Sequence, residues 1–443
     1  MATSSRFGAE DLSFSSGLGR RGFMKTVLTG TAVSAAALSR LNASIYESLG
    51  VLNERHLGEP APDGAYWEAL KRHFMFQDDL IMMNNGTVGP MPRPVFNTLM
   101  KYFRMQVANP YDVYNYLPTL KEAVRVKLAA FIGASPDETV LTSNTTEGIN
   151  LVAQGLDLAE GDEVLMTNLE HPGGINPWKI REKRHGIVVR EIPVGVPPKS
   201  VGEFVEAFAR ALTPKTRVIF LSHTVYMTGL IAPLKEISRM AHEKGILVAA
   251  DSAHGLGMLD LNMKDLGVDF FASSPYKWMG APTGIGLLYI RKEVQDRLWP
   301  TIVSSGWDAV QTGARRFDPQ GQRADAMVMA LGEALEFQNV IGKARIARRI
   351  RGLAAHLKSG LKTIPGVTLH TPEDPYLSAG LTVFSLKGVN SQAIVDYVRE
   401  KHNLVIRTVG ISAEDITAVR VSTPIYISTK EVDMVLAGVR HFS

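Results

Sequence analysis

GILVAADSAHGLGMLDLNMKDLGVDFFASSPYKWMGAPTGIGLLYIR, the stretch Gly245–Arg291, decides the fold. Its apolar run Ile246–Ala250 is typical of a buried strand, and Asp251 follows at the carboxyl end, where α/β folds place their ligands. A second apolar run precedes Lys277, and a glycine-rich turn then leads into a third strand over 287–290. Taken alone, an aspartate and a lysine at strand ends are more often a structural carboxylate and a solvated amine.

Together, the two residues suit the chemistry of pyridoxal 5′-phosphate (PLP). A lysine amine can bond covalently to the cofactor aldehyde, and a carboxylate can keep the pyridine nitrogen protonated so that the ring withdraws electrons. We therefore predict that Lys277 holds PLP and that Asp251 faces its ring nitrogen. A nicotinamide dehydrogenase is disfavoured, because no G-x-G-x-x-G opens a helix after a strand. A non-catalytic binding protein is the alternative of another class, and the presence of both residues argues against it.

Size and composition set broad limits on function. The 443 residues suffice for two domains, and 45% hydrophobic with 21% charged residues is ordinary for a globular protein. The net charge of +4 comes without a long basic tract, so no nucleic-acid partner is predicted. Cysteine is absent, which excludes disulfides, thiolate metal ligands and cysteine nucleophiles. No metal site is predicted.

Residues 1–45 are expected to lie outside the fold. Arg20-Arg21, with Phe23 and Lys25, resembles a twin-arginine export signal, and the weakly apolar run Thr26–Leu38 that follows is too short to span a bilayer. We therefore expect recognition by the twin-arginine export machinery, no stable membrane anchor, and a periplasmic or exported location in a bacterium. The alternative is an amino-terminal tail with a chance pair of arginines.

Strands and helices alternate from about residue 65 onward, which is typical of a mostly parallel sheet covered by helices. Beyond Trp307 the pattern changes to two long helices separated at Gly342, followed by short strands and helices. We predict an α/β protein with a large domain over 65–310 and a smaller α+β domain over 311–443, to which the first helix, over 65–77, can contribute.

Several motifs occur in an order typical of one family. They are SNTTEGIN, EHP, DSAHG, SSPYKW with GAPTGIG, and VRVSTPIY. Over about residues 65–440 the chain resembles the class V aminotransferases, which include cysteine desulfurases and isopenicillin N epimerase-like proteins. The resemblance implies the PLP-dependent transferase fold of type I, with a seven-stranded type of sheet in the large domain, and a homodimer.

The resemblance also implies roles for single residues. Lys277, Asp251 and His171 would be catalytic, with His171 stacked on the cofactor ring. Arg420 would bind the substrate carboxylate, with Arg407 as a second candidate. The remaining cofactor contacts fall on hydroxyl and imidazole side chains, namely Thr145, Thr146, His254, Ser274 and Tyr276.

Ordinary alternatives remain open at these positions when the residues are considered without the family. Amides and hydroxyls at the predicted helix start Thr145–Thr146 can cradle a phosphate, or Thr146 can simply cap the helix. The two histidines, His171 and His254, can be polar residues of a loop and a turn. Arg407 and Arg420 can belong to surface ion pairs.

The sequence departs from the family in three places. The loop 407–416 contains no cysteine, so the persulfide-forming desulfurases are poor models. Tyr226 stands where desulfurases carry an asparagine near the substrate. Gln320-Gly321-Gln322 replaces a Gly-Thr that in many relatives reaches the phosphate bound by the other subunit, which leaves this contact open.

We expect an enzyme that acts on an amino acid or another small primary amine. Transamination is the family default, in which Lys277 moves a proton from Cα to the cofactor. Epimerisation or racemisation, and β-elimination including carbon–sulfur cleavage, begin in the same way and stay open. The sequence does not name the substrate, and the loops expected to determine it are 109–116 and 304–322.

Overall fold

The structure is a computed structural model that describes residues 64–77, 79–318 and 321–443. The predicted export signal at Arg20-Arg21 lies outside these ranges and stays a prediction. None of the helices in the described part of the chain is long and apolar enough to cross a membrane.

A seven-stranded sheet, in the order β2-β8-β7-β6-β5-β3-β4, organises the chain between residues 139 and 290. Neighbouring strands run parallel, except that β8 is antiparallel to both β7 and β2. This arrangement confirms the predicted mostly parallel sheet. The strands are β2 (Thr139–Thr142), β3 (Glu163–Thr167), β4 (Val188–Ile192), β5 (Thr216–Ser222), β6 (Leu247–Asp251), β7 (Phe270–Ser273) and β8 (Gly286–Ile290).

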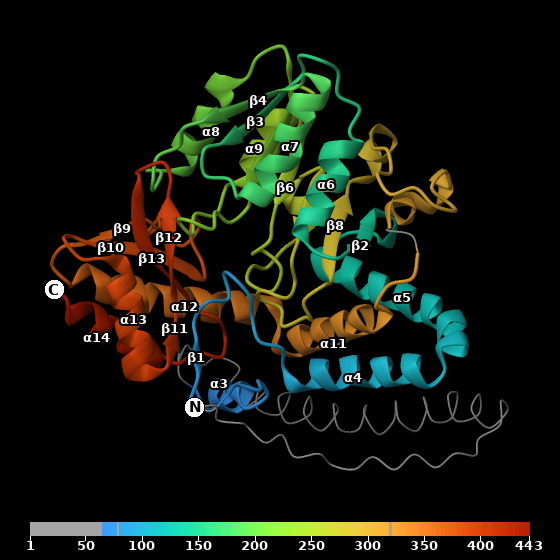
Figure 1. The fold of residues 1–443 in the computed structure, drawn as a ribbon. Helices are drawn as coiled ribbons and strands as arrows, with labels where there is room; N and C mark the ends of the chain where they lie inside the picture. The colour runs from blue at the N-terminus through green and yellow to red at the C-terminus, as the bar shows by residue number, and fades with distance from the viewer. Residues whose placement is uncertain (1–63, 78, 319–320) are drawn as a thin grey trace, which may run out of the picture. The chain divides into compact units, whose positions relative to one another are not determined.

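Helices pack against this sheet, which explains why its strands are near-continuous apolar runs (Figure 1). A buried cluster that includes Trp178, Phe220 and Phe270 joins α6 and α7 to the strands. On the chain between β4 and β7, α9 packs against β6, and α8 and α10 pack against α9. The helices are α6 (Thr145–Gly155), α7 (Pro172–His185), α8 (Val201–Ala211), α9 (Leu234–His242) and α10 (Met263–Leu266).

Three long helices lie beside one another in Figure 1. They are α4 (Arg93–Ala108), α5 (Pro110–Ile132) and α11 (Asp325–Ile341). The predicted substrate loop over 109–116 is wrong, because these residues form the cap and first turns of α5. The helix starts here because Pro110 suits its first position, and because the Asn109 side chain accepts a hydrogen bond from the Asp112 N–H at 3.1 Å.

The carboxyl-terminal part contains a four-stranded antiparallel sheet in the order β12-β13-β10-β9. Gly342, with φ of 90°, separates α11 from α12 at the predicted position. The strands of this sheet are β9 (Val367–Leu369), β10 (Leu381–Leu386), β12 (Arg407–Ile411) and β13 (Ile416–Ser422). Its helices are α12 (Lys343–Lys362), α13 (Ser391–His402) and α14 (Thr429–Arg440).

A short strand near the beginning of the described chain pairs with one in its carboxyl-terminal part. β1 (Ile81–Met82) forms a parallel two-stranded sheet with β11 (Leu404–Val405). The helix predicted over 65–77 is shorter than expected, because α3 spans only Ala65–Lys71. The pairing brings the loop that follows β1 to the carboxyl-terminal sheet. The domain boundary predicted near residue 310 stays a prediction.

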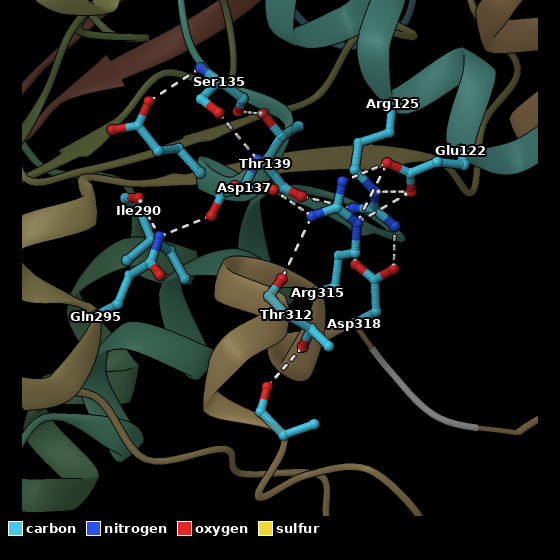
Figure 2. A network of polar contacts seen from close by, with 12 residues as sticks. Glu122, Arg125, Ser135, Asp137, Thr139, Ile290, Gln295, Thr312, Arg315 and Asp318 are labelled. Carbon is cyan, nitrogen blue, oxygen red and sulfur yellow. Dashed lines mark hydrogen bonds and ion pairs between the residues drawn. The ribbon is translucent and has the colours of Figure 1, made fainter.

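A buried arginine ties the segment after residue 310 to the central sheet (Figure 2). Arg125 in α5 pairs with the Asp318 carboxylate and donates to the Thr139 carbonyl at 2.5 Å. Asp318 in turn accepts a hydrogen bond from the Leu141 N–H in β2 at 3.0 Å. Further along, Arg323 donates to the Leu141 carbonyl at 2.9 Å. The chain on both sides of residues 319–320 is therefore held at the strand that leads into α6.

A second arginine extends the same network, as Figure 2 shows. Arg315 lies in the 3₁₀ helix η3 (Val310–Phe317) and pairs with Glu122 of α5. It also pairs with Asp137, at 2.5 Å, in the 3₁₀ helix η1 (Pro136–Glu138). A third such helix, η2, spans Lys292–Arg297. The segment predicted as loop 304–322 therefore contains helical structure that is fixed by ion pairs.

Candidate active site

The predicted cofactor residues converge on one pocket at the carboxyl ends of the central strands. The pocket has a volume of about 490 Å³. The predicted residues in its lining are Thr145, Thr146, His171, Asp251, His254, Ser274, Tyr276 and Lys277. The lining also includes Tyr226, noted above only as a departure, and residues that the sequence analysis did not single out, namely Asn144, Ser222, Thr224 and Ala253.

Hydroxyl groups gather at the start of α6. The Thr145 and Ser274 hydroxyl oxygens lie 2.7 Å apart, and the Thr145 N–H donates to the Ser274 hydroxyl at 3.1 Å. The alternative of Thr146 as helix cap is wrong, because Asn144 has the extended cap conformation and accepts from the Glu147 N–H at 3.0 Å. Amides and hydroxyls at a helix amino terminus are the donors that a phosphate group needs.

Asp251 ends β6 and is buried in the pocket wall. Its Oδ1 accepts a hydrogen bond from the Ala253 N–H at 3.0 Å. Burial raises the pKa of Asp251, whereas Lys277 and His171 act in the opposite direction. A buried carboxylate gains most from a cationic partner, and a protonated ring nitrogen is such a partner.

Lys277 presents a desolvated amine to the same pocket. Burial lowers the pKa of Lys277 from 10.5 to about 8; the Asp251 carboxylate opposes this shift and the Arg420 guanidinium adds to it. A lysine with a pKa of about 8 is roughly one-tenth free base at pH 7, a far larger share than for an ordinary lysine. The free base is the form that attacks an aldehyde and accepts a proton.

The loop over residues 84–90, which the sequence motifs did not single out, holds the backbone of this lysine. Asn85 donates from Nδ2 to the Lys277 carbonyl at 2.9 Å, and the Tyr426 hydroxyl donates to Asn85 Oδ1 at 2.5 Å. Gly89 donates its N–H to the Tyr276 carbonyl at 3.1 Å. A β-carbon at Gly89 would lie 2.2 Å from the Lys277 carbonyl oxygen, so the close approach requires glycine. The signal in the sequence was the pair of glycines flanking Thr87-Val88.

His171 caps α7 at the mouth of the pocket. Its Nδ1 accepts the Gly173 N–H at 3.0 Å, so the neutral ring carries its hydrogen on Nε2. Desolvation by the surrounding protein lowers the pKa of His171, Asp251 opposes this, and Lys277 and other cations add to it. The Tyr226 ring contacts the imidazole edge to face, with centroids 4.9 Å apart. The neutral imidazole is therefore braced at the wall, as stacking on a flat ring requires.

His254 has its tautomer set by the residue after the lysine. The indole N–H of Trp278 donates to His254 Nδ1 at 3.2 Å. Burial holds the pKa of His254 well below its ordinary value, so the ring is neutral and its hydrogen lies on Nε2. Trp278 in turn packs so closely on Gly380 that a β-carbon there would lie 2.7 Å from the indole. His254 is thus a hydrogen-bond donor among the residues that line the pocket.

Arg420 in β13 is buried, although it is not part of the pocket lining. Its guanidinium donates to neutral oxygens, which belong to the Tyr226 carbonyl (3.2 Å), the Asn84 side chain (3.2 Å) and the Thr87 hydroxyl (3.1 Å). Burial, together with the nearby Arg407 charge, lowers the pKa of Arg420 to about 10. Within residues 64–77, 79–318 and 321–443, no acidic side chain forms an ion pair with Arg420. A buried cation of this kind is suited to an incoming carboxylate.

Arg407 lies at the surface, directly opposite Arg420 in the β12–β13 pairing. It donates to the Thr408 carbonyl at 2.9 Å and to the Thr87 hydroxyl at 3.3 Å. The structure therefore places the two candidate substrate arginines at different depths, with Arg420 inside and Arg407 at the rim.

The groups in the pocket fit PLP. Hydroxyls and amides at the α6 start suit its phosphate, the Asp251 carboxylate suits its ring nitrogen, and the Lys277 amine suits its aldehyde. Thr224 adds a buried hydroxyl that has no hydrogen-bond partner among the described residues. The part of the chain that the structure describes contains no cluster of histidine, aspartate and glutamate able to hold a metal ion. The individual roles of the site residues stay predictions.

Comparisons with known proteins agree with this chemistry. A family model described as aminotransferase class-V matches residues 82–435. Isopenicillin N epimerase of Streptomyces clavuligerus is 32% identical over 337 residues, which cover 73% of this chain and 85% of that protein. Isopenicillin N epimerase of Amycolatopsis lactamdurans is 30% identical over 395 residues, which cover 85% of this chain and 98% of that protein. A probable cysteine desulfurase of Methanothermobacter thermautotrophicus is 28% identical over 356 residues, which cover 77% of this chain and 86% of that protein.

Solved structures share the fold. A mutant of C-DES with glycine covalently linked to its PLP cofactor aligns with a TM-score of 0.77 and 26% identity, covering 84% of this chain and 99% of that one. The complex of the cystine C–S lyase C-DES with its reaction product cysteine persulfide aligns with a TM-score of 0.74 and 27% identity, covering 81% of this chain and 97% of that one. Both matches support the predicted α/β fold of PLP-dependent enzymes. From its motifs, its fold and these matches, the chain belongs to the class V aminotransferase family, whose cofactor is pyridoxal phosphate.

Proposed function

We propose that this chain is a PLP-dependent enzyme that removes the α-proton of an amino acid or another small primary amine, and that it carries out transamination. The observation that carries the proposal is the position of the Lys277 amine. Its pKa is lowered to about 8, and it shares one pocket with the Asp251 carboxylate and the hydroxyl cradle at the α6 start. Binding, electron withdrawal and proton transfer can therefore occur in one place.

Bound PLP supplies the electron-withdrawing ring that weakens the Cα–H bond of an attached amino acid. The residues of this chain supply the rest. Asp251 stabilises positive charge at the ring nitrogen, and Thr145 with Ser274 holds the phosphate. Arg420 orients the substrate carboxylate. The Lys277 amine accepts the proton from Cα and delivers it to the cofactor.

Epimerisation is the second candidate, and the two isopenicillin N epimerases among the relatives favour it. It needs the same α-proton removal, followed by return of the proton to the opposite face of Cα. Carbon–sulfur cleavage is a third outcome, which the likeness to the cystine lyase suggests. A desulfurase that passes sulfur to its own cysteine is excluded, because the chain has no cysteine.

The test is product analysis of the purified, PLP-loaded protein with a panel of amino acids in deuterium oxide, with and without a keto-acid acceptor. Transamination predicts a keto product that depends on the acceptor. Inversion at Cα with deuterium incorporation and no acceptor would instead establish epimerisation, and sulfide or persulfide from cysteine or cystine would establish the lyase. Failure to exchange the α-proton of any amino acid or amine would contradict the proposal.

We also propose that the protein is a homodimer, since family members are typically dimeric. The molar mass in solution, measured by light scattering, checks this directly. A single chain has a mass of 48.4 kDa, so a dimer scatters as a particle of twice that mass.

A further inference from the structure

Two arginines stand directly opposite each other in the carboxyl-terminal sheet. Arg407 of β12 pairs in register with Arg420 of β13. Directly opposed residues of antiparallel strands project from the same face with their β-carbons about 5 Å apart, and like charges in this position destabilise a sheet. The pair therefore has a cost to stability that a purely structural role does not explain.

Nothing acidic offsets the pair. No carboxylate in the described ranges lies within ion-pair distance of either guanidinium, and both converge on the hydroxyl of Thr87, at 3.1 Å from Arg420 and 3.3 Å from Arg407. Arg420 Nε is buried without a hydrogen-bond partner. A buried charge without a counter-charge is expensive, so the arrangement is best satisfied by anions that arrive from outside.

The two charges act on the cofactor pocket. Burial raises the pKa of Tyr226, which lines the pocket, and both Arg420 and Arg407 oppose that rise. Arg420 also contributes to the lowered pKa of Lys277 and His171. The positive charges of the exposed Arg407 and the buried Arg420 therefore both make the electrostatic potential at the pocket wall more positive.

We propose that the substrate carries two acidic groups, with its α-carboxylate bound at Arg420 and a second carboxylate, or a group of equal charge, bound at Arg407. The substrate class is then the dicarboxylic amino acids and acidic amino-acid derivatives. Two anionic groups neutralise the two opposed cations, and each can form a bidentate pair with a guanidinium. This inference rests on the proposed function and deepens it.

The test compares two anions of equal length, glutarate with two carboxylates and pentanoate with one. Their dissociation constants are measured on the PLP-loaded protein from the change in cofactor absorbance, for the parent and for Arg407→Gln, Arg407→Lys and Arg399→Gln. Arg399→Gln is the matched control, because it removes the same charge from an exposed arginine of α13 whose side chain, among the described residues, donates only to the Asn403 carbonyl. We expect parent, control and Arg407→Lys to bind glutarate more tightly than pentanoate. Arg407→Gln should weaken glutarate about tenfold, the loss of one charge-assisted pair, and pentanoate less than about twofold.

A kinetic comparison uses L-glutamate and L-norvaline, which have the same number of carbon atoms. Arg407→Gln should raise KM for glutamate about tenfold, the loss of one charge-assisted pair, and KM for norvaline by less than about twofold. Equal weakening of both anions, or no preference for glutarate in the parent, would overturn the dianionic substrate. Failure of the proposed function is distinguishable, because anion binding is measured without turnover: a protein that prefers glutarate but exchanges no α-proton retains the dianion site and lacks the proposed activity.

Discussion

The reactivity of the site depends on the protonation of one amine. Lys277 has a pKa of about 8 because burial disfavours its charged form, and only the uncharged amine attacks an aldehyde. In protein stripped of cofactor, the rate of PLP capture should rise with pH and level off above about 8. Free lysine in solution is the control, and its rate should keep rising toward 10.5. Stopped-flow absorbance measures both, and a capture rate that still rises steeply near pH 10 would contradict the lowered pKa.

The hydrogen bond from Trp278 to His254 gives a second prediction at this scale. Trp278→Phe keeps an aromatic ring against Gly380 but removes the N–H that fixes the imidazole tautomer. The family resemblance implies that His254 would lie near the phenolic oxygen of the cofactor, where an oriented donor would favour loss of a proton from the bound cofactor. The variant should therefore raise the pH at which bound-cofactor absorbance titrates, by roughly half to one unit.

The matched control is Trp178→Phe. Trp178 is buried in the core against Phe220, and its indole N–H has no hydrogen-bond partner in the described part of the chain. This substitution should leave the absorbance titration unchanged. A purely structural role for Trp278 would instead lower the melting temperature without moving the titration.

The residues of the pocket were largely predictable because they sit within short motifs at strand ends. The contacts between Trp278 and His254, and between Asn85 and Lys277, were not. Each contact joins two positions that are far apart in the chain. Neither the hydrophobic periodicity nor the local spacing of residues predicts which side chains meet in this way. The burial of Arg420 could not be predicted from the sequence either, because the residues that cover it, in the loop 84–89 and at Tyr226, are distant from it in the chain.

Among the elements, strands were predicted best where both faces are buried. The strands predicted over Ile246–Ala250 and 287–290 match β6 (Leu247–Asp251) and β8 (Gly286–Ile290) to within one residue, and every residue of both strands is buried. The start of α5 was missed, because Pro110 and the polar, aromatic residues after it lack the apolar period of a helix. There, the Asn109 cap and packing against α11 overrule the local pattern.

The buried arginine of α5 should be important for stability. Arg125→Met removes the cation that holds Asp318 and the Thr139 carbonyl, and leaves a half-buried carboxylate without its partner. We expect a loss of about 3 kcal/mol in the free energy of unfolding, measured by urea denaturation. The control is Arg210→Gln, which breaks only the exposed pair with Glu206 and should cost less than about 0.5 kcal/mol. Equal stability of the two variants would show that this network does not anchor the segment after residue 310.

For the molecule as a whole, the export signal remains a proposal that experiment can separate from catalysis. Replacement of Arg20 and Arg21 by lysine should leave a PLP-loaded, active enzyme in the cytoplasm of a bacterial host, whereas the parent is exported. The export machinery reads the arginine pair as an address, and lysine preserves only its charge. Cell fractionation measures the distribution. Parent and variant in the same compartment would refute the twin-arginine assignment.

The central claim is that Lys277 carries the cofactor, and one measurement tests it most directly. The PLP-loaded protein is reduced with borohydride, digested and mapped by mass spectrometry, with Lys277→Ala and the exposed-lysine control Lys264→Ala treated in parallel. We predict a pyridoxyl group on the peptide containing Lys277 in the parent and in the control, and none in Lys277→Ala. A label on any other lysine, or an unchanged label in Lys277→Ala, would contradict the account.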